Sequence, residues 1–181
     1  MLTMSSMVIV LFKPRIGHIR EKRLPRIGHI YPIKEVVFRG SKNKTRDKES
    51  IYGKILEVIV LVNSGFETET PQLLVPVAVA ERLDLWPSLP RNYSVVEYMT
   101  AGGPVRNYVL RNEILVKVKV EYDTQVVLSD LVISTIENEV LIGDKLAGEL
   151  GIIVYDFAKG IWRLKSDSEN TRRISERRQV W

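Results

Sequence analysis

The clearest pattern in the 181-residue chain is an alternation of apolar and polar residues over Glu113–Glu121. Strict alternation with a period of two is typical of a strand that buries one face in an antiparallel sheet. Gln125–Ser134 follows after a turn around Asp123 and is expected to be the partner strand. The buried face of the first strand should carry Ile114, Val116, Val118 and Val120.

Other segments also have the character of strands. Lys54–Val62 is a continuous apolar run rich in β-branched residues, which predicts a buried strand. It stops at Asn63-Ser64-Gly65, a combination typical of a turn. Ile152–Tyr155 and Gly160–Leu164 predict a last hairpin around Phe157–Lys159.

Two short helices are expected between these strands. Val75–Leu83 has Pro76 in its first turn, where proline is tolerated. Lys145–Leu150 should be a helix with Asp144 as its N-cap and Gly151 closing its end. Many short strands with frequent turns and few helices predict a closed all-β domain.

Charge divides the chain into three segments. The net charge of +5 consists of about +8 over residues 1–50, −5 over 51–164 and +2 over 165–181. We therefore expect a basic N-terminal extension over 1–50, a folded domain over 51–165, and a basic polar tail over 166–181 that is a frayed helix or disordered. Basic arms of this kind are either simply solvated or attract nucleic acid.

The extension contains the hexapeptide Pro-Arg-Ile-Gly-His-Ile twice, at residues 14–19 and 25–30, followed by a polar linker over Arg39–Ser50. A local duplication in an exposed arm explains it more simply than a metal site built on His18 and His29. With no cysteine and two histidines, the chain cannot build a thiolate or three-histidine metal site. We expect no metal and no cofactor.

The apolar run Met7–Phe12 is too short for a signal peptide or a membrane span. The sequence therefore predicts a cytoplasmic protein with no membrane partner.

Four segments, in their order, resemble the retroviral-type (retropepsin-like) aspartic peptidases, including their cellular relatives in microbes. That family has an apolar strand ending in Asp-Thr/Ser-Gly, a short helix, a glycine-rich flap, and an apolar pair followed by glycine before a second helix. The corresponding segments are Ile59–Gly65, Pro76–Leu83, Thr100–Gly103 and Val140–Leu146.

The resemblance implies a retropepsin-like closed β-barrel with one or two short helices, an active-site loop and a flap hairpin, in a homodimer that acts on extended peptides. It implies that Asn63 occupies the catalytic aspartate position, with Ser64 and Gly65 supporting the loop. Thr100, Ala101, Gly102 and Gly103 would form the substrate-binding flap. No second Asp-Ser/Thr-Gly motif is present, so two chains would be needed for one site.

The family residue that carries the acid–base chemistry is replaced. Paired aspartates share a proton, whereas the Asn63 amide cannot act as a general base at neutral pH. The chain is therefore expected to be inactive or nearly so. Three explanations remain: a natural non-catalytic protein, a peptidase in which aspartate was replaced to trap it, or deamidation of Asn63 to aspartate, which we rank last.

Other chemistries fit less well. Glu67 and Glu69 are expected to be surface charges, and Ser64 lacks a neighbouring base for a serine nucleophile. The Ala101-Gly102-Gly103 loop lacks the Gly-Lys-Ser/Thr ending of a phosphate loop. The alternative function is a non-catalytic peptide-binding or scaffolding homodimer, with basic arms that could bind nucleic acid.

Overall fold

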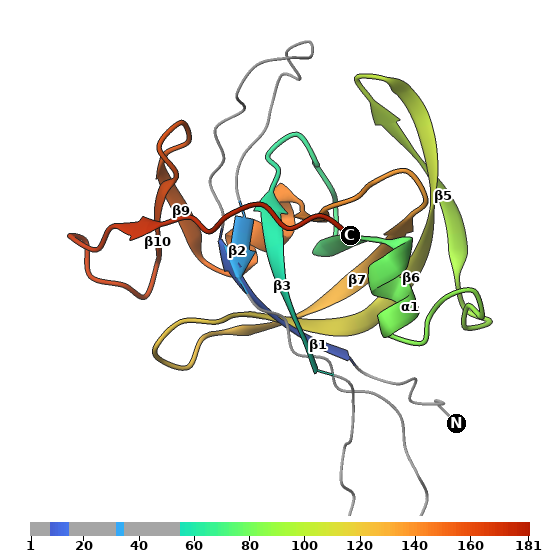
Figure 1. Cartoon of the computed structure of the whole chain (residues 1–181), viewed down its shortest axis with the longest axis horizontal. Helices are drawn as coiled ribbons and strands as arrows, with labels where there is room; N and C mark the ends of the chain where they lie inside the picture. Colours follow the sequence, from blue (N-terminus) through green and yellow to red (C-terminus); the bar gives the residue numbers. More distant parts are fainter. Residues whose placement is uncertain (1–7, 15–31, 35–54) are drawn as a thin grey trace, which may run out of the picture.

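The computed structural model describes residues 8–14, 32–34 and 55–181, and within these residues nearly all regular structure is β-strand (Figure 1). The all-β prediction is confirmed. Two six-residue helices are the exceptions, α1 (Val77–Arg82) and α2 (Asp144–Glu149). The strands are β1 (Val8–Pro14), β2 (Pro32–Lys34), β3 (Ile55–Val62), β4 (Gln72–Pro76), β5 (Ser94–Thr100), β6 (Gly103–Val118), β7 (Val126–Ser134), β8 (Val140–Ile142), β9 (Ile152–Asp156), β10 (Ile161–Leu164) and β11 (Arg173–Ile174).

The strands form two sheets. The larger sheet has the order β1-β3-β8-β4-β7-β6-β5, with β2 paired to β3. β1 also pairs with β6. The predicted closed β-barrel is not found among the described residues, because β2 and β5 each pair on one side only and β9–β11 form a separate sheet. The smaller sheet, with the order β11-β10-β9, lies at the end of the molecule opposite the β5–β6 hairpin (Figure 1).

The predicted central hairpin is confirmed. Strands β6 and β7 pair antiparallel, and Ile114, Val116 and Val118 of β6 are buried. Val120, which was expected on the same face, lies beyond the end of β6 and is only half-buried. β6 is longer than predicted, because the arm that follows the glycine-rich tip continues into the alternating segment. An irregularity between Leu110 and Ile114 joins the two parts, and Asn112 adopts a positive φ of 50° there.

The interior consists of two clusters of buried side chains. The larger cluster lies among β3, β4, β6, β7 and the two helices. The smaller one is centred on Val109 and Val132 and is covered by Val96 and Tyr98 of β5. Its fully buried members are Phe66, Leu74, Val109, Val132 and Leu141. This second cluster lies between the loop after β3 and the β5–β6 hairpin, and therefore supports both.

Two local predictions are wrong. The helix predicted from Val75 begins at Val77, since residues 72–76 form β4. The N-cap of α2 is Gly143 and not Asp144, whose carboxylate has a different role described below.

The two ends of the chain also differ from expectation. Tail residues 173–174 form β11 and pair with β10, so this part is neither a helix nor disordered. The predicted N-terminal extension contributes β1 and β2, both paired with β3. Apart from Pro14 at the end of β1, the duplicated hexapeptides and the linker over 39–50 lie outside the described residues.

Within the described residues, no helix has the length and apolar character needed to cross a membrane.

Candidate functional site

The loop after β3 is a tight turn built around Asn63. The Asn63 N–H donates to the carbonyl of Ile142 on the parallel strand β8 over 3.0 Å. The Asn63 side-chain Oδ1 accepts from the Gly65 N–H over 3.0 Å, which is the hydrogen bond of an Asx turn. Asn63 is half-buried, whereas Ser64 and Gly65 are exposed.

The start of α2 holds this loop in place. The Asp144 N–H donates to the Phe66 carbonyl over 3.2 Å, and Asp144 Oδ1 accepts from the Thr68 N–H over 3.2 Å. A Cβ at Gly143 would lie only 2.6 Å from the Phe66 carbonyl oxygen. Residue 143 must therefore be glycine for the loop to approach so closely.

The predicted flap is an exposed β-hairpin of β5 and β6 (Figure 1). Thr100 Oγ1 donates to the Gly103 carbonyl over 2.7 Å and accepts from the Gly102 N–H over 3.1 Å. Gly103 has a φ of 109°, which side chains disfavour. Thr100–Gly103 thus forms a closed turn, with Ala101 and Gly102 exposed at its tip.

Tyr98 connects this hairpin to the loop region. Its hydroxyl donates to Gln72 Oε1 over 3.0 Å, and its ring centroid lies 5.9 Å from that of Phe66. Burial raises the pKa of the Tyr98 hydroxyl, which favours the protonated form that donates this bond. Among the described residues no hydrogen bond joins the Thr100–Gly103 tip directly to Asn63–Gly65. The two predicted parts of the site are connected through Tyr98, two residues before the tip.

A polar network beside the loop was not predicted. The buried Asp130 carboxylate accepts from Thr70 Oγ1 over 2.7 Å, from Arg111 Nη1 over 2.6 Å and from the Asn112 N–H over 2.8 Å. Gln72 Nε2 donates to Thr70 Oγ1 over 3.2 Å, which links this network to Tyr98. Its members are up to 60 residues apart in sequence, so no local motif reveals it.

The chemistry available at the loop is that of an amide and a hydroxyl. Glu67 and Glu69, which follow the loop, are both exposed. The Asp144 carboxylate is bound to the N–H groups of Thr68 and Lys145, as a structural acceptor would be. In the described part of the chain no group of three histidine or acidic side chains could hold a metal ion. The site can bind and orient a polar backbone, but it offers no evident proton-transfer pair.

No family model, curated protein or solved structure matches this chain. Any functional conclusion must therefore be drawn from the geometry of the loop and the hairpin.

Proposed function

We propose that this protein is a retropepsin-like domain that pairs with a second copy of itself and binds extended peptides without hydrolysing them. The observation that carries the proposal is the position of Asn63. It follows strand β3, whose Val58, Val60 and Val62 are buried, and its loop is hydrogen-bonded to the Gly143–Asp144 segment. In the resemblance, this is the position of the family aspartate.

Three further features support the retropepsin-like part of the proposal. β3 and β8 pair in parallel and end side by side at Asn63 and Gly143, the two segments that the resemblance aligns with the active-site loop and the second glycine motif. The domain is built almost entirely of β-strands, with two short helices, as the resemblance implies. The hairpin follows β4 and α1 in the expected order and has a glycine-rich tip.

The homodimer accounts for the exposure of the loop. Ser64 and Gly65 face solvent in the single chain, although the strand before them is buried. A second copy placed across this loop would bring two Asn63 side chains together under two hairpins. A peptide held there would be bound through its main chain, as in strand addition.

Loss of hydrolysis follows from the amide. Two carboxyls in such a pair would share one proton and activate a water, and the removal of general acid–base catalysis commonly lowers rates by about 10²–10⁴-fold. Asn63 keeps the hydrogen bond to Gly65 but has no proton to exchange at neutral pH.

The decisive test compares the wild-type chain with Asn63→Asp in a peptide-library cleavage assay from acidic to neutral pH. We expect cleavage only by the Asn63→Asp variant, with an acidic optimum. Asn170→Asp is the matched control, because it makes the same change at an exposed residue near β11. Intact-mass analysis must show that Asn63 is not deamidated, and sedimentation analysis should show a dimer in all three proteins.

Each part of the proposal has its own contradicting result. Cleavage by the intact wild-type chain would show that the protein is an active peptidase. A silent but dimeric Asn63→Asp variant would remove the link to aspartic peptidases. A monomer at all concentrations tested would remove the shared site.

A further inference from the structure

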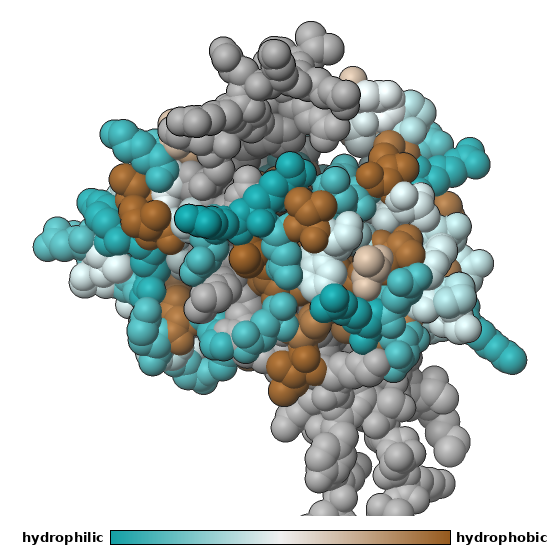
Figure 2. Space-filling view, in the orientation of Figure 1, coloured by the Kyte–Doolittle hydropathy of each residue, from teal (hydrophilic) through white to brown (hydrophobic). Residues whose placement is uncertain are grey.

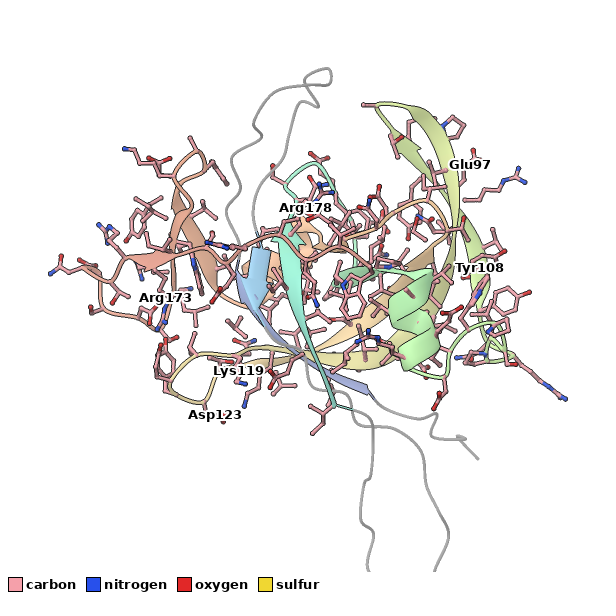
Figure 3. The ribbon with its side chains drawn as sticks, in the orientation of Figure 1. Glu97, Tyr108, Lys119, Asp123, Arg173 and Arg178 are labelled. Carbon is pink, nitrogen blue, oxygen red and sulfur yellow. The ribbon has the colours of Figure 1, made fainter. Side chains whose placement is uncertain are left out.

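A cluster of two arginines and a tyrosine lies on the small sheet, far from the loop and hairpin. Tyr155 is on β9, Arg163 is on β10, and Arg172 precedes β11. Figure 3 shows that this end of the molecule, marked by Arg173, lies opposite the hairpin end, marked by Glu97. Figure 2 shows hydrophilic side chains around hydrophobic ones at the end where Figure 1 places β9 and β10.

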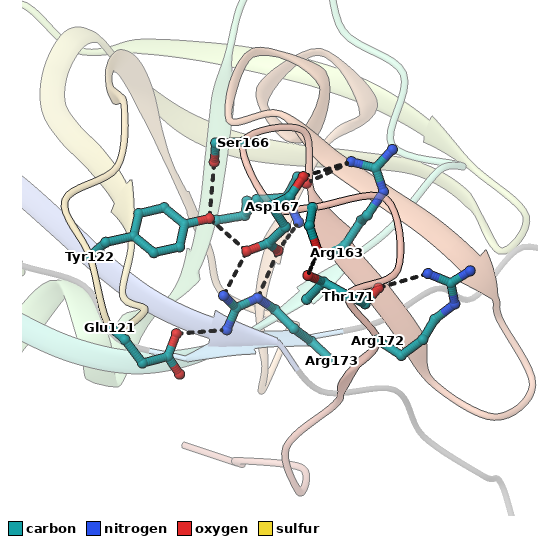
Figure 4. Close-up of polar contacts among 10 residues, drawn as sticks. Glu121, Tyr122, Arg163, Ser166, Asp167, Thr171, Arg172 and Arg173 are labelled. Carbon is teal, nitrogen blue, oxygen red and sulfur yellow. Dashed lines mark hydrogen bonds and ion pairs between the residues drawn. The ribbon is translucent and has the colours of Figure 1, made fainter.

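The two guanidinium groups are fixed against the tyrosine. Arg172 Cζ lies 3.9 Å from the centroid of the Tyr155 ring, which is a cation–π contact. Arg163 Nε donates to the Tyr155 hydroxyl over 2.6 Å. Arg172 Nη1 also donates to the main-chain carbonyls of Glu169 and Thr171, both over 2.8 Å, so its side chain is ordered before any ligand binds. Figure 4 shows the bond to Thr171.

Neither Arg163 nor Arg172 forms an ion pair with a carboxylate among the described residues, in contrast to Arg173 beside them. Arg173 donates to Asp167 over 2.7 Å and to Glu121 over 3.0 Å (Figure 4). The hydrogen bond from Arg173 is the main reason that the pKa of Asp167 is lowered to about 2. The nearby Asp167 charge is therefore already compensated.

The other charges near the cluster are largely compensated among themselves. Asp156 is paired with Lys159 over 3.4 Å, and Asp167 and Glu121 are paired with Arg173. Glu169 contributes one exposed carboxylate to the turn before Arg172. The guanidinium groups thus remain available to a ligand that carries negative charge.

We infer that this cluster binds single-stranded nucleic acid. Arg163 Nη1 already donates to the main-chain carbonyls of Leu164 and Asp167, over 3.1 and 3.5 Å. The Nη2 groups of Arg163 and Arg172 would therefore donate to phosphate oxygens. A base would stack on the Arg172–Tyr155 pair, since both arginine planes and aromatic rings serve as stacking platforms for unpaired bases. Phe157, which is 44% exposed in the adjacent turn, offers a second aromatic surface. This function would be additional to peptide binding and does not depend on it.

The test measures fluorescence anisotropy of the full chain with labelled oligothymidylate and oligouridylate of about 16 nucleotides, which is long enough for one compact site. Salt is varied from about 50 to 200 mM. The variant is Arg163→Gln/Arg172→Gln. The control, Arg91→Gln/Arg106→Gln, removes the same charge from two exposed arginines at the other end of the molecule.

We expect the Arg163→Gln/Arg172→Gln variant to lose about tenfold or more in affinity. The slope of log affinity against log salt should become shallower by about 1.4, since each lost contact to a single strand contributes about 0.7. The control variant should keep the wild-type slope of log affinity against log salt over the same range of salt. The two oligonucleotides separate DNA from RNA as the preferred strand.

Tyr155 variants distinguish stacking from charge. Tyr155→Leu should weaken binding without changing the salt slope, while Tyr155→Phe should retain most of the affinity, because the ring is kept. Thermal unfolding of each variant shows that it is folded.

Three results would overturn the inference: no binding at the lowest salt, equal losses in the control and the Arg163→Gln/Arg172→Gln variant, or equally tight binding of heparin or a phosphorylated peptide. The last result would show attraction of any polyanion.

Discussion

Glu113 is the buried carboxyl that follows the irregularity in β6, where the alternation of the strand is re-established. Its side chain is 2% exposed, and Oε2 has no hydrogen-bond partner in the described part of the chain. Burial raises the pKa of Glu113 to about 7. Ionisation of this residue is therefore more costly in the folded protein than in the unfolded chain.

This pKa predicts how stability depends on pH. Between the unfolded value of 4.5 and about 7 the folded state binds more protons, so stability should fall as pH rises through this window. Glu113→Gln should remove that dependence and be more stable than the wild type at pH 8 by about 1–3 kcal/mol, since one pKa unit corresponds to about 1.4 kcal/mol. Urea unfolding at pH 4.5 and pH 8 checks this. An equal loss of stability in both proteins would show that another group is responsible.

The residues of the loop show what the sequence can and cannot reveal. Asn63-Ser64-Gly65 after an apolar run predicts a turn at the end of a strand, and the structure has one there. The role of Asp144 could not be predicted, because its carboxylate accepts from Thr68, 76 residues earlier. An aspartate can either cap a helix or accept a hydrogen bond from a distant loop, and only the fold shows which of the two roles Asp144 has.

The part of the β5–β6 hairpin near its tip contacts the loop region through Tyr98. Tyr98→Phe should remove the hydrogen bond to Gln72 and lower stability by about 1 kcal/mol. Because this bond joins the hairpin to the loop region, amides of β5 should exchange faster in the variant than in the wild type. Hydrogen exchange followed by mass spectrometry measures this.

Tyr93→Phe is the matched control for Tyr98→Phe. Tyr93 precedes β5, is 44% exposed and contacts Tyr108 through its ring. Its substitution should leave β5 exchange unchanged. If the two variants behave alike, the Tyr98 hydroxyl does not hold the hairpin.

Elements with a strong local pattern could be predicted, and the others could not. Alternation identifies β6 and β7, and a continuous apolar run identifies β3. β4 was not predicted because it begins with the polar Gln72. The Gln72 side chain is buried and hydrogen-bonds to Thr70 and Tyr98, contacts that the sequence does not reveal. β11 has two residues and exists only because β10 lies beside it.

At the scale of the whole molecule, the C-terminal segment crosses the large sheet and fastens distant parts of the chain (Figure 1). Gln179 Oε1 accepts from the Ile59 N–H of β3 over 2.7 Å. The Trp181 N–H donates to the Asn138 carbonyl over 2.9 Å, and its ring lies under Arg82 of α1, with Arg82 Cζ 4.4 Å from the ring centroid. Trp181 also packs against the larger core cluster.

Trp181→Ala should therefore lower the free energy of unfolding by roughly 2–4 kcal/mol. This is slightly less than the loss expected when a fully buried tryptophan is replaced by alanine. Arg177→Ala, at an exposed residue of the same segment, should change stability by less than about 0.5 kcal/mol. Urea denaturation of both variants provides the comparison. Equal stability of the two would show that the segment lies on the surface without supporting it.

The hydrogen bonds between Asp144 and the loop at Phe66 and Thr68 also have a consequence for the order of events during translation. The Phe66 carbonyl and the Thr68 N–H are bound by Asp144, which lies 76 residues after Thr68, and the Ile59 N–H is bound by Gln179, which lies 120 residues after Ile59. Contacts across such long separations form only after both segments have left the ribosome. The hydrogen bonds that hold the loop around Asn63 therefore cannot form until Asp144, 76 residues after Thr68, has left the ribosome.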